Sequence, residues 1–240
     1  MSFAIILAGG SGSRVKGASV PKQYIEVGGK PVISYVLETV YSVGEISEIA
    51  VVSASEWRDE IMSLAVGAAE EVGREPVGLT VNFADPGENR QLSILNGLHV
   101  LSDVAGEDDL VAIVDAARPN MSRELLSETL AAAASCDGAI PVTPMKDTVY
   151  LSEEGKRISS LLPRDQVFAG QAPEAFLFGK YLSANEALLP DRILEIHGST
   201  EPAILAGMDI AMIPGDEKNF KITTAEDLER FRAQVEGEMH

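Results

Sequence analysis

Short apolar runs alternate along this chain with longer stretches whose apolar residues recur at helical spacing. A short apolar run bounded by turn residues is typical of a buried strand, and the longer pattern is typical of an amphipathic helix. The predicted strands cover residues 4–7, 48–54, 79–83, 110–114, 138–142 and 209–213, and the predicted helices cover residues 31–43, 56–73, 91–102, 122–135 and 176–189. This alternation predicts βαβ units, and therefore an α/β fold built on a mostly parallel sheet.

Three loops follow predicted strands directly, over residues 8–22, 86–93 and 115–119. Ligands of parallel sheets bind beyond the carboxyl ends of the strands, so loops at that edge can share one site. We therefore expect these three loops to lie at the same edge of the sheet and to form a binding site together.

The first of these loops combines glycines with basic residues. Gly9, Gly10 and Gly12 follow the first strand, and Arg14 and Lys22 come after them. Glycines let the backbone approach a ligand and leave N–H groups free to face an anion, which the basic side chains can neutralise. The loop is a candidate phosphate cradle, and a flexible surface loop with solvated lysines is the alternative.

Two better-known phosphate-binding loops do not fit this stretch. The dinucleotide fingerprint G-x-G-x-x-G, started at Gly10, requires a third glycine where Val15 stands. The P-loop, started at Gly12, requires a lysine where Ala18 stands. A Rossmann oxidoreductase, which the βαβ pattern alone would allow, is therefore disfavoured.

The chain is strongly acidic, with 19 Lys and Arg against 37 Asp and Glu and a formal net charge of −18. This excess disfavours binding to nucleic acid or to an anionic membrane surface. A small anionic ligand is compatible with it, because several basic residues stand beside glycines or prolines in non-periodic loops. These residues are Arg14, Lys22, Arg90, Arg118, Arg164 and Lys221.

Cysteine usage and hydropathy indicate a cytoplasmic protein. Cys136 is the only cysteine of the 240 residues, so no intrachain disulfide can form. No stretch approaches the roughly 20 apolar residues of a membrane helix, and the apolar run near the N-terminus is too short for a signal peptide. The three histidines are scattered and, together with Cys136, make no zinc-ligand spacing.

Residues 146–162 interrupt the α/β pattern. Two short β-prone stretches flank the turn sequence SEEGK, which predicts a hairpin that packs at an edge or protrudes as an arm. Farther along, Thr224 and Asp227 form a capping box that begins a final helix. Since no linker or repeat divides the chain, we expect one domain over residues 1–240, with a hairpin arm at about 144–168.

Asp115 ends an apolar strand and precedes Arg118. A carboxylate in this place can bind Mg²⁺, which prefers oxygen ligands and bridges phosphates, and a turn or helix cap is the alternative role. Cations around a strand-end carboxylate suit phosphate-ester transfer, which depends on positioning and charge stabilisation and requires no protein nucleophile. A substrate phosphate could attack the α-phosphate of a nucleotide and expel pyrophosphate.

Six motifs carry a resemblance to a known family. They are LAGGSGSR…PKQY, PGENRQLSILNGL, VDAARP, PVTPMKDT, PRDQVFAGQAPEAF and NFKITTAEDL, in this order between residues 4 and 231. The chain resembles 2-C-methyl-D-erythritol 4-phosphate cytidylyltransferase and its sister, ribitol-5-phosphate cytidylyltransferase. The resemblance implies a Rossmann-like nucleotidyltransferase fold and a Mg²⁺-dependent reaction of CTP with a polyol phosphate that gives a CDP-alcohol and pyrophosphate. It also implies a homodimer whose hairpin arms exchange contacts.

The same resemblance implies roles for individual residues. Arg14 and Lys22 would contact the triphosphate and stabilise the pentacoordinate state, and Lys221 would contact the phosphate at the centre. Asp115 would hold the metal. Arg118, Thr148 and Arg164 would bind the acceptor, the last two in the partner subunit's site. The nucleotide would be held by Ala8, Gly9, Gly10, Gly12, Gly87 and Ser93.

The chain departs from the usual family sequence at two places. Pro86 and Gly87 stand where the family usually has two glycines, in the loop that would hold the base. Ala172 and Glu174 replace the threonine and glutamine of a TPQ sequence, which removes a hydroxyl near the acceptor and adds a charge. Both polyol phosphates are therefore open as the acceptor, and a non-catalytic nucleotide-binding homologue is the alternative to an enzyme.

Overall fold

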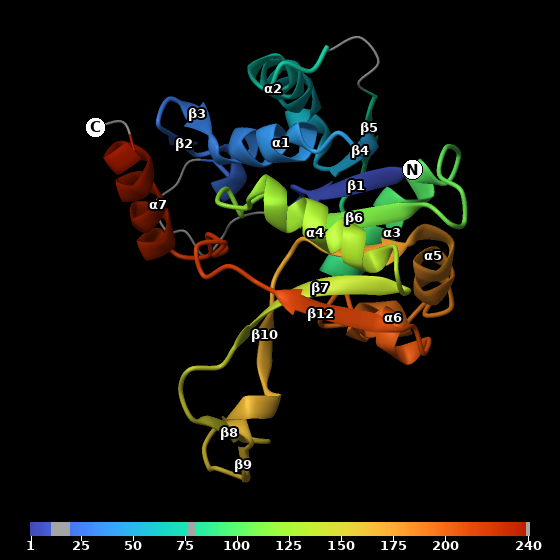
Figure 1. Cartoon of the computed structure of the whole chain (residues 1–240), viewed down its shortest axis with the longest axis vertical. Coiled ribbons are helices and arrows are strands. Elements are labelled where there is room, and N and C mark those ends of the chain that lie inside the picture. Colours follow the sequence, from blue (N-terminus) through green and yellow to red (C-terminus); the bar gives the residue numbers. More distant parts are fainter. Residues whose placement is uncertain (11–19, 76–79, 239–240) are drawn as a thin grey trace.

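A central sheet of eight strands organises the molecule (Figure 1). The computed structural model describes residues 1–10, 20–75 and 80–238. Along the sheet the strands follow the order β10-β7-β11-β6-β1-β4-β5, and β12 pairs with β7. Their bounds are β1 (Ser2–Leu7), β4 (Ile46–Val52), β5 (Val81–Ala84), β6 (Leu110–Asp115), β7 (Gly138–Pro144), β10 (Phe168–Gly170), β11 (Glu174–Leu177) and β12 (Ile210–Pro214).

Most of the sheet is parallel, as the sequence predicts. β1 pairs in parallel with β4 and β6, β4 with β5, and β7 with β12. β1, β4 and β6 are near-continuous apolar runs because helices cover both faces of the sheet at these strands. β11 runs antiparallel between β6 and β7, and β10 is antiparallel to β7.

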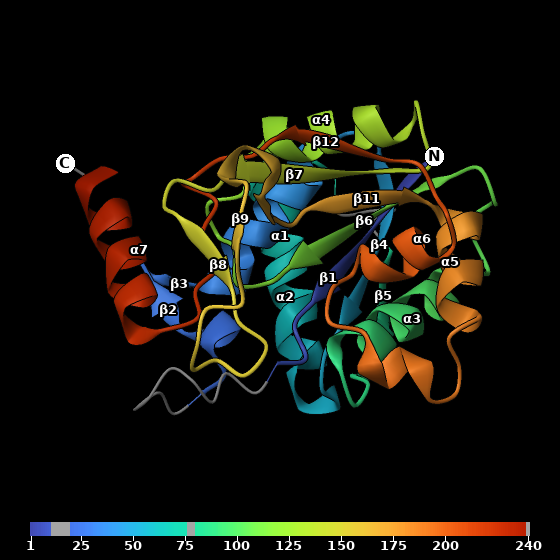
Figure 2. The ribbon, with the colours of Figure 1, turned by 90° about the horizontal axis from the view of Figure 1, so that it is seen from below.

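Helices cover both faces of the sheet and make a three-layer structure (Figures 1 and 2). Ala4 and Ile6 of β1 belong to one core cluster, with side chains of α1, α2 and α4. Phe3 and Ile5, which alternate with them, belong to another cluster with α3 and α5. The helices are α1 (Val32–Ser42), α2 (Arg58–Glu71), α3 (Arg90–Leu101), α4 (Arg123–Ala133), α5 (Phe178–Glu186), α6 (Glu201–Leu205) and α7 (Ala225–Glu238).

Caps and short elements complete the fold. The predicted capping box is confirmed: Asp227 N donates to Thr224 Oγ1, and Thr224 N donates to Asp227 Oδ2, at 3.2 and 2.8 Å. Two short strands, β2 (Glu26–Val27) and β3 (Lys30–Pro31), pair around Gly28 and Gly29, which both have positive φ. The 3₁₀ turns are η1 (Lys22–Tyr24), η2 (Ser55–Trp57), η3 (Arg164–Gln166) and η4 (Arg192–Glu195).

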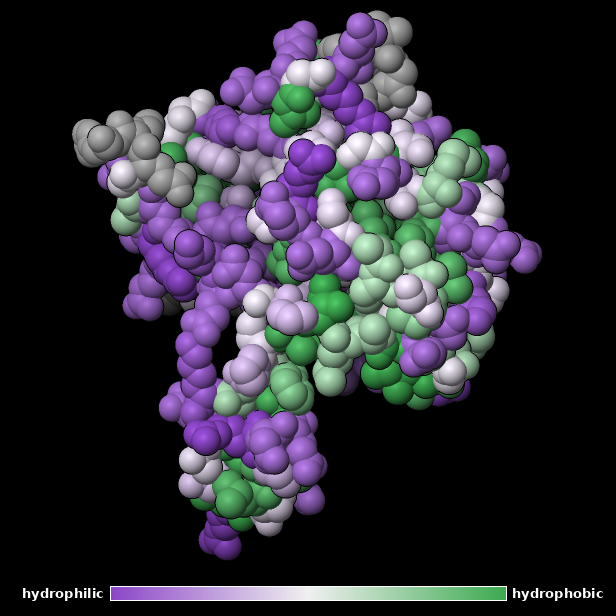
Figure 3. Space-filling model, viewed as in Figure 1, coloured by the Kyte–Doolittle hydropathy of each residue, from purple (hydrophilic) through white to green (hydrophobic). Residues whose placement is uncertain are grey.

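The predicted hairpin protrudes from the body as an arm (Figure 1). Strands β8 (Val149–Leu151) and β9 (Ser160–Leu162) form a separate antiparallel sheet, and within the described residues they pair with no other strand. Several apolar side chains of the arm face solvent, and Figure 3 shows hydrophobic atoms gathered near its tip. The exposed apolar side chains of the arm include those of Tyr150, Leu151, Ile158 and Leu161.

The structure differs from the sequence-based expectation mainly around β11. The helix predicted over 176–189 begins at Phe178, because residues 174–177 form a strand inserted between β6 and β7. The strand predicted over 79–83 is observed as β5, while residue 79 lies outside the described residues. No helix in the described part of the chain has the length and apolarity needed to cross a bilayer.

Candidate functional site

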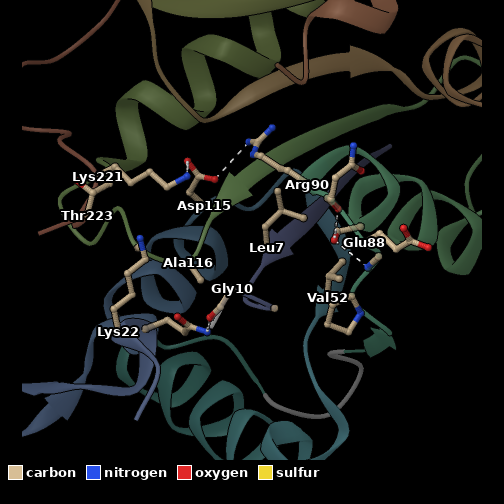
Figure 4. A pocket seen from close by; sticks show the side chains of 17 residues that line it. Leu7, Gly10, Lys22, Val52, Glu88, Arg90, Asp115, Ala116, Lys221 and Thr223 are labelled. Atoms are coloured by element: carbon tan, nitrogen blue, oxygen red, sulfur yellow. Dashed lines mark hydrogen bonds and ion pairs between the residues drawn. The ribbon is translucent and has the colours of Figure 1, made fainter. Parts of the chain in front are cut away.

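The three predicted loops meet in one pocket at the carboxyl ends of β1, β5 and β6. The pocket has a volume of about 400 Å³, and Figure 4 shows side chains pointing into it from all three loops. A fourth segment joins them, since Lys221 and Thr223 also line the pocket. The expectation that these loops share one edge of the sheet is confirmed.

The glycine-rich loop is fixed at its start by the side chain of Gln23. Gln23 is buried, and its Nε2 donates to Ala8 O and Gly10 O, at 2.5 and 3.0 Å. Ala8 is buried behind the pocket, whereas Gly9 and Gly10 line it. A Cβ atom on Gly9 would lie 2.7 Å from Pro86 Cγ, so the glycine permits close approach of the first two loops. Gly12 and Arg14 lie outside the described residues.

The second loop presents Gly87 and Ser93 to the pocket together, as predicted. Gly87 N donates to Ser93 Oγ at 3.0 Å, and Ser93 Oγ donates to Asn89 O at 2.8 Å. Asn89 caps helix α3, because its side chain accepts a hydrogen bond from Leu92 N. A Cβ on Gly87 would lie 2.6 Å from Leu92 Cβ, so this turn also requires glycine.

Three basic side chains form ion pairs with Asp115 at the carboxyl end of β6. Its Oδ2 lies 3.1 Å from both Arg118 Nε and Lys221 Nζ, and its Oδ1 lies 3.3 Å from an Arg90 guanidinium nitrogen. Burial alone would raise the pKa of Asp115, but the charges of Arg90, Lys221 and Arg118 outweigh it and hold the pKa well below its usual range. The side chain therefore serves as a fixed negative centre rather than as a helix or turn cap.

Two lysines approach the pocket from neighbouring segments. Lys22 Nζ donates to Ile222 O at 2.6 Å, next to Lys221 in the chain. Ile222 N in turn donates to Ala117 O at 2.8 Å, which ties the segment of Lys221 to the loop after β6. Lys22 and Lys221 thus both lie on the pocket wall (Figure 4), and their contacts with a triphosphate stay a prediction.

Arg118 supports Asp115 from outside the pocket lining. Its side chain is only 13% exposed, and NH1 donates to Asn219 O at 2.7 Å while Nε contacts Asp115. It does not line the pocket, so its direct interaction with an acceptor stays a prediction.

Thr148 and Arg164 belong to the arm and do not line the pocket of their own chain. Arg164 NH1 donates to Lys146 O at 3.0 Å, within the arm. Their predicted place in a partner's site stays a prediction.

Arg90 is a pocket residue for which the resemblance implies no role, although it is one of the basic loop residues that suit an anionic ligand. It begins α3 and lines the pocket beside Asp115. Its position in a loop that follows a strand was the available signal, because the other basic residues of such loops also converge here.

Of the two departures from the family sequence, Pro86 and Gly87 line the pocket, whereas Ala172 and Glu174 lie outside its lining. Ala172 and Glu174 are 3% and 8% exposed. Glu174 contacts Arg90, with one oxygen 3.8 Å from the guanidinium, and Ser199 Oγ donates to the same oxygen. Burial raises the pKa of Glu174, and Arg90 and Ser199 offset that effect only in part.

The comparisons with known proteins agree with this geometry. Residues 2–236 match the sequence profile of the family IspD, 2-C-methyl-D-erythritol 4-phosphate cytidylyltransferase. A protein of that name from Geobacter metallireducens is 35% identical over 94% of both chains. A ribitol-5-phosphate cytidylyltransferase from Streptococcus agalactiae is 28% identical and covers 97% of this chain and 95% of its own.

The structural comparison leads to the same family. The crystal structure of 4-diphosphocytidyl-2C-methyl-D-erythritol synthase from Anaerococcus prevotii has a TM-score of 0.79 and 28% identity, over 98% of this chain and 96% of the other. Sequence match, fold and the convergence of the motif residues in one pocket all agree. The chain belongs to the 2-C-methyl-D-erythritol 4-phosphate cytidylyltransferase family of nucleotidyltransferases.

Proposed function

We propose that this protein transfers a cytidylyl group from CTP to a polyol phosphate and releases pyrophosphate and a CDP-alcohol. The observation that carries the proposal is the pocket at the sheet edge, where cations surround the buried carboxylate of Asp115 beside two glycine-containing loops. Relatives named for transfer to methylerythritol phosphate and to ribitol phosphate support it.

The chemistry requires no nucleophile from the protein. A phosphate oxygen of the acceptor forms a bond to the α-phosphorus of CTP, and the bond from that phosphorus to the bridging oxygen breaks, with pyrophosphate as the leaving group. Negative charge gathers on the phosphate oxygens in the transition state. Lys22 and Lys221, which line the pocket, can stabilise it, and we assign the same role to Arg14 from the motif.

The nucleotide fits the glycine side of the pocket. The backbone of Gly9 and Gly10 and the turn from Gly87 to Ser93 offer polar main-chain groups to the cytosine and ribose. We assign the same role to Gly12 from the motif. Ala8 would support this surface from behind, because its N–H donates to Val52 O at 2.9 Å and its carbonyl accepts from Gln23.

Asp115 suits a magnesium site of the kind that takes few ligands from the protein. Within the described residues no group of three or more His, Cys, Asp or Glu side chains could hold a metal, so phosphate oxygens and water would complete the coordination. Bound Mg²⁺ would supply charge neutralisation on the triphosphate. Asp115 is ionised and lies among the phosphate-binding cations, which favours this role.

The arm supports a homodimer with exchanged arms. Apolar side chains on both of its strands face solvent, including Tyr150 and Leu161 at 54% and 62% exposure. Contact with a second chain would bury them and would bring Thr148 and Arg164 to the partner's pocket. We place the protein in the cytoplasm, a location that fits its single cysteine.

The test is pyrophosphate release from CTP and Mg²⁺ with methylerythritol 4-phosphate and, separately, ribitol 5-phosphate. We expect turnover with one of them, and the higher sequence identity favours the first. Asp115→Ala serves as the control and should abolish release. Binding of CTP without turnover on either acceptor or any other polyol phosphate would contradict the proposal and leave a nucleotide-binding protein.

A further inference from the structure

Arg90 lies between two buried carboxylates. Its guanidinium is 3.3 Å from Asp115 Oδ1 and 3.8 Å from Glu174 Oε2, and the three side chains are 33%, 7% and 10% exposed. Asp115 also pairs with Arg118 and Lys221, whereas Arg90 is the cation that Glu174 contacts within the described chain. The second carboxylate therefore acts on the pocket cation that begins α3.

The position of Glu174 is set by the sheet and by a buried polar chain. It lies on β11 opposite Ile113, two residues before Asp115 on the neighbouring strand. Ser199 Oγ donates to its carboxylate, and Tyr181 Oη donates to Ser199 O at 2.7 Å. Gln91, next to Arg90 in α3, donates to Tyr181 Oη at 3.2 Å.

This closed set of contacts fixes Glu174 and Arg90 relative to each other. Tyr181 is further held by stacking on Phe176, with ring centroids 4.0 Å apart. Removing the carboxylate of a buried ion pair is costly, because the cation then stays buried without a counter-charge. The cluster joins three cations, Arg90, Arg118 and Lys221, to two carboxylates, Asp115 and Glu174, so the ionisation of Glu174 bears on the charge balance of the cluster.

We propose that Glu174 is a positioning residue that holds Arg90 at the floor of the pocket and limits how tightly the site binds pyrophosphate-like anions. The inference rests on the proposed function for its kinetic part. The carboxylate keeps the guanidinium beside Asp115, and its negative charge lowers the attraction of the pocket for phosphates. A tight grip on both substrate and product would not raise turnover.

The first variant is Glu174→Gln, which has the same shape and keeps an oxygen acceptor for Ser199. We expect pyrophosphate, measured by calorimetry at pH 8, to bind about threefold to tenfold tighter because one negative charge is lost near the cations. We expect kcat to fall about tenfold, because Arg90 loses one of its two anchors. A merely structural defect would instead weaken binding and turnover together.

Two further variants sharpen the test. Glu128→Gln removes the same charge from an exposed position on α4 and should change neither quantity. Glu174→Asp keeps the charge but withdraws it from Arg90, so pyrophosphate affinity should stay within about twofold while kcat falls. This variant also decides the question if Glu174→Gln does not fold.

The outcomes separate this inference from the proposed function. Tighter pyrophosphate binding with lower kcat in Glu174→Gln supports it, and every other pair of changes overturns it. If the wild-type protein turns over neither acceptor, the proposed function fails. Pyrophosphate binding alone then decides, with tighter binding in Glu174→Gln supporting the role of the charge and unchanged or weaker binding overturning it.

Discussion

Two adjacent glycines of the first loop have different structural tasks. A Cβ on Gly9 would lie within 2.8 Å of two atoms of the Pro86 ring, whereas a Cβ on Gly10 would meet nothing within 4 Å. Proline is stiff, so the clash at Gly9 can be relieved only by moving one of the two loops. Gly9 therefore sets the distance between the loops, and Gly10 leaves the pocket open.

This difference predicts opposite outcomes for two alanine variants. Gly9→Ala should reduce the free energy of unfolding by about 1–3 kcal/mol, which is typical of overpacking. Gly10→Ala should leave it within about 0.5 kcal/mol, as for substitutions without a packing clash. Denaturant unfolding of both variants checks this, and equal losses would show that the close contact with Pro86 does not limit the fold.

Lys22 offers a test of transition-state stabilisation at the pocket wall. Lys22→Ala should lower kcat by about 100-fold or more while changing the dissociation constant of CTP much less. Lys180→Ala is the control, since Lys180 pairs with Asp137 away from this pocket. Single-turnover kinetics and calorimetry measure the two quantities, and equal losses in both would make Lys22 a binding residue only.

At the scale of elements, the segment after β12 joins the arm to the pocket. Gln171, at the arm's base, donates from Nε2 to Asp216 O and accepts from Asp216 N, at 2.9 and 3.1 Å. Asn219 donates to Ala172 O at 2.8 Å, and its carbonyl accepts from Arg118. The same segment ends at Lys221, so the arm's base and a pocket lysine share one support.

Gln171→Leu should therefore lower kcat/KM about threefold to tenfold although Gln171 does not line the pocket. Its effect should be smaller when Lys221 is already replaced by alanine, because the two changes then act on the same contact. A double-mutant cycle on kcat/KM measures this coupling. Strictly additive effects would show that the segment does not transmit the position of the arm's base to Lys221.

Helix α7 depends on the cap formed by Asp227. One carboxylate oxygen accepts from Thr223 N, Thr223 Oγ1 and Thr224 N. Partial burial opposes ionisation, but these hydrogen bonds outweigh it and lower the pKa of Asp227. The ionised cap holds the helix whose Phe231 packs edge-on against Tyr35.

Asp227→Ala should cost about 1 kcal/mol of unfolding free energy at pH 7. Because the folded-state pKa is depressed, this advantage of the wild type is complete above the unfolded pKa of about 3.9 and is lost as pH falls through the folded pKa. Urea unfolding of both proteins between pH 7 and acid conditions measures it. A difference that stays constant down to the lowest pH would contradict the assigned role of the charge.

The sequence predicted those elements whose pattern is local. The parallel strands were predictable because each is a continuous apolar run, and the shared edge of their loops follows from topology alone. β11 was not, because EAFL adjoins a helical pattern and its insertion between β6 and β7 depends on distant strands. For the same reason the contact of Glu174 with Arg90 was not predictable, because it depends on a strand register that the sequence does not show. Arg90 escaped assignment because its partners are distant in the chain.

At the scale of the whole molecule, the position of Arg164 on the arm allows a test of whether each pocket is built from both chains of a dimer. If Arg164 acts in the partner's pocket, mixing Arg164→Ala chains with inactive Lys22→Ala chains should restore activity after subunit exchange. Half of the dimers would be mixed, and each would have one intact site, so about a quarter of wild-type activity is expected. No recovery, with exchange verified by differently tagged chains, would show that each pocket is completed by its own chain.

The arm leaves and re-enters the body at paired strands, with Thr143 opposite Ala169 and Val142 opposite Gly170. Strand pairing therefore holds the two ends of the arm together at its base. The entropic cost of closing a loop grows only slowly with its length, so residues can be added or exchanged beyond these paired ends with little loss of stability in the rest of the protein. Apart from Thr148 and Arg164, the hairpin is thus free to diverge and to determine which chains pair: two related chains in one cell could keep identical pockets and still assemble only with copies of themselves.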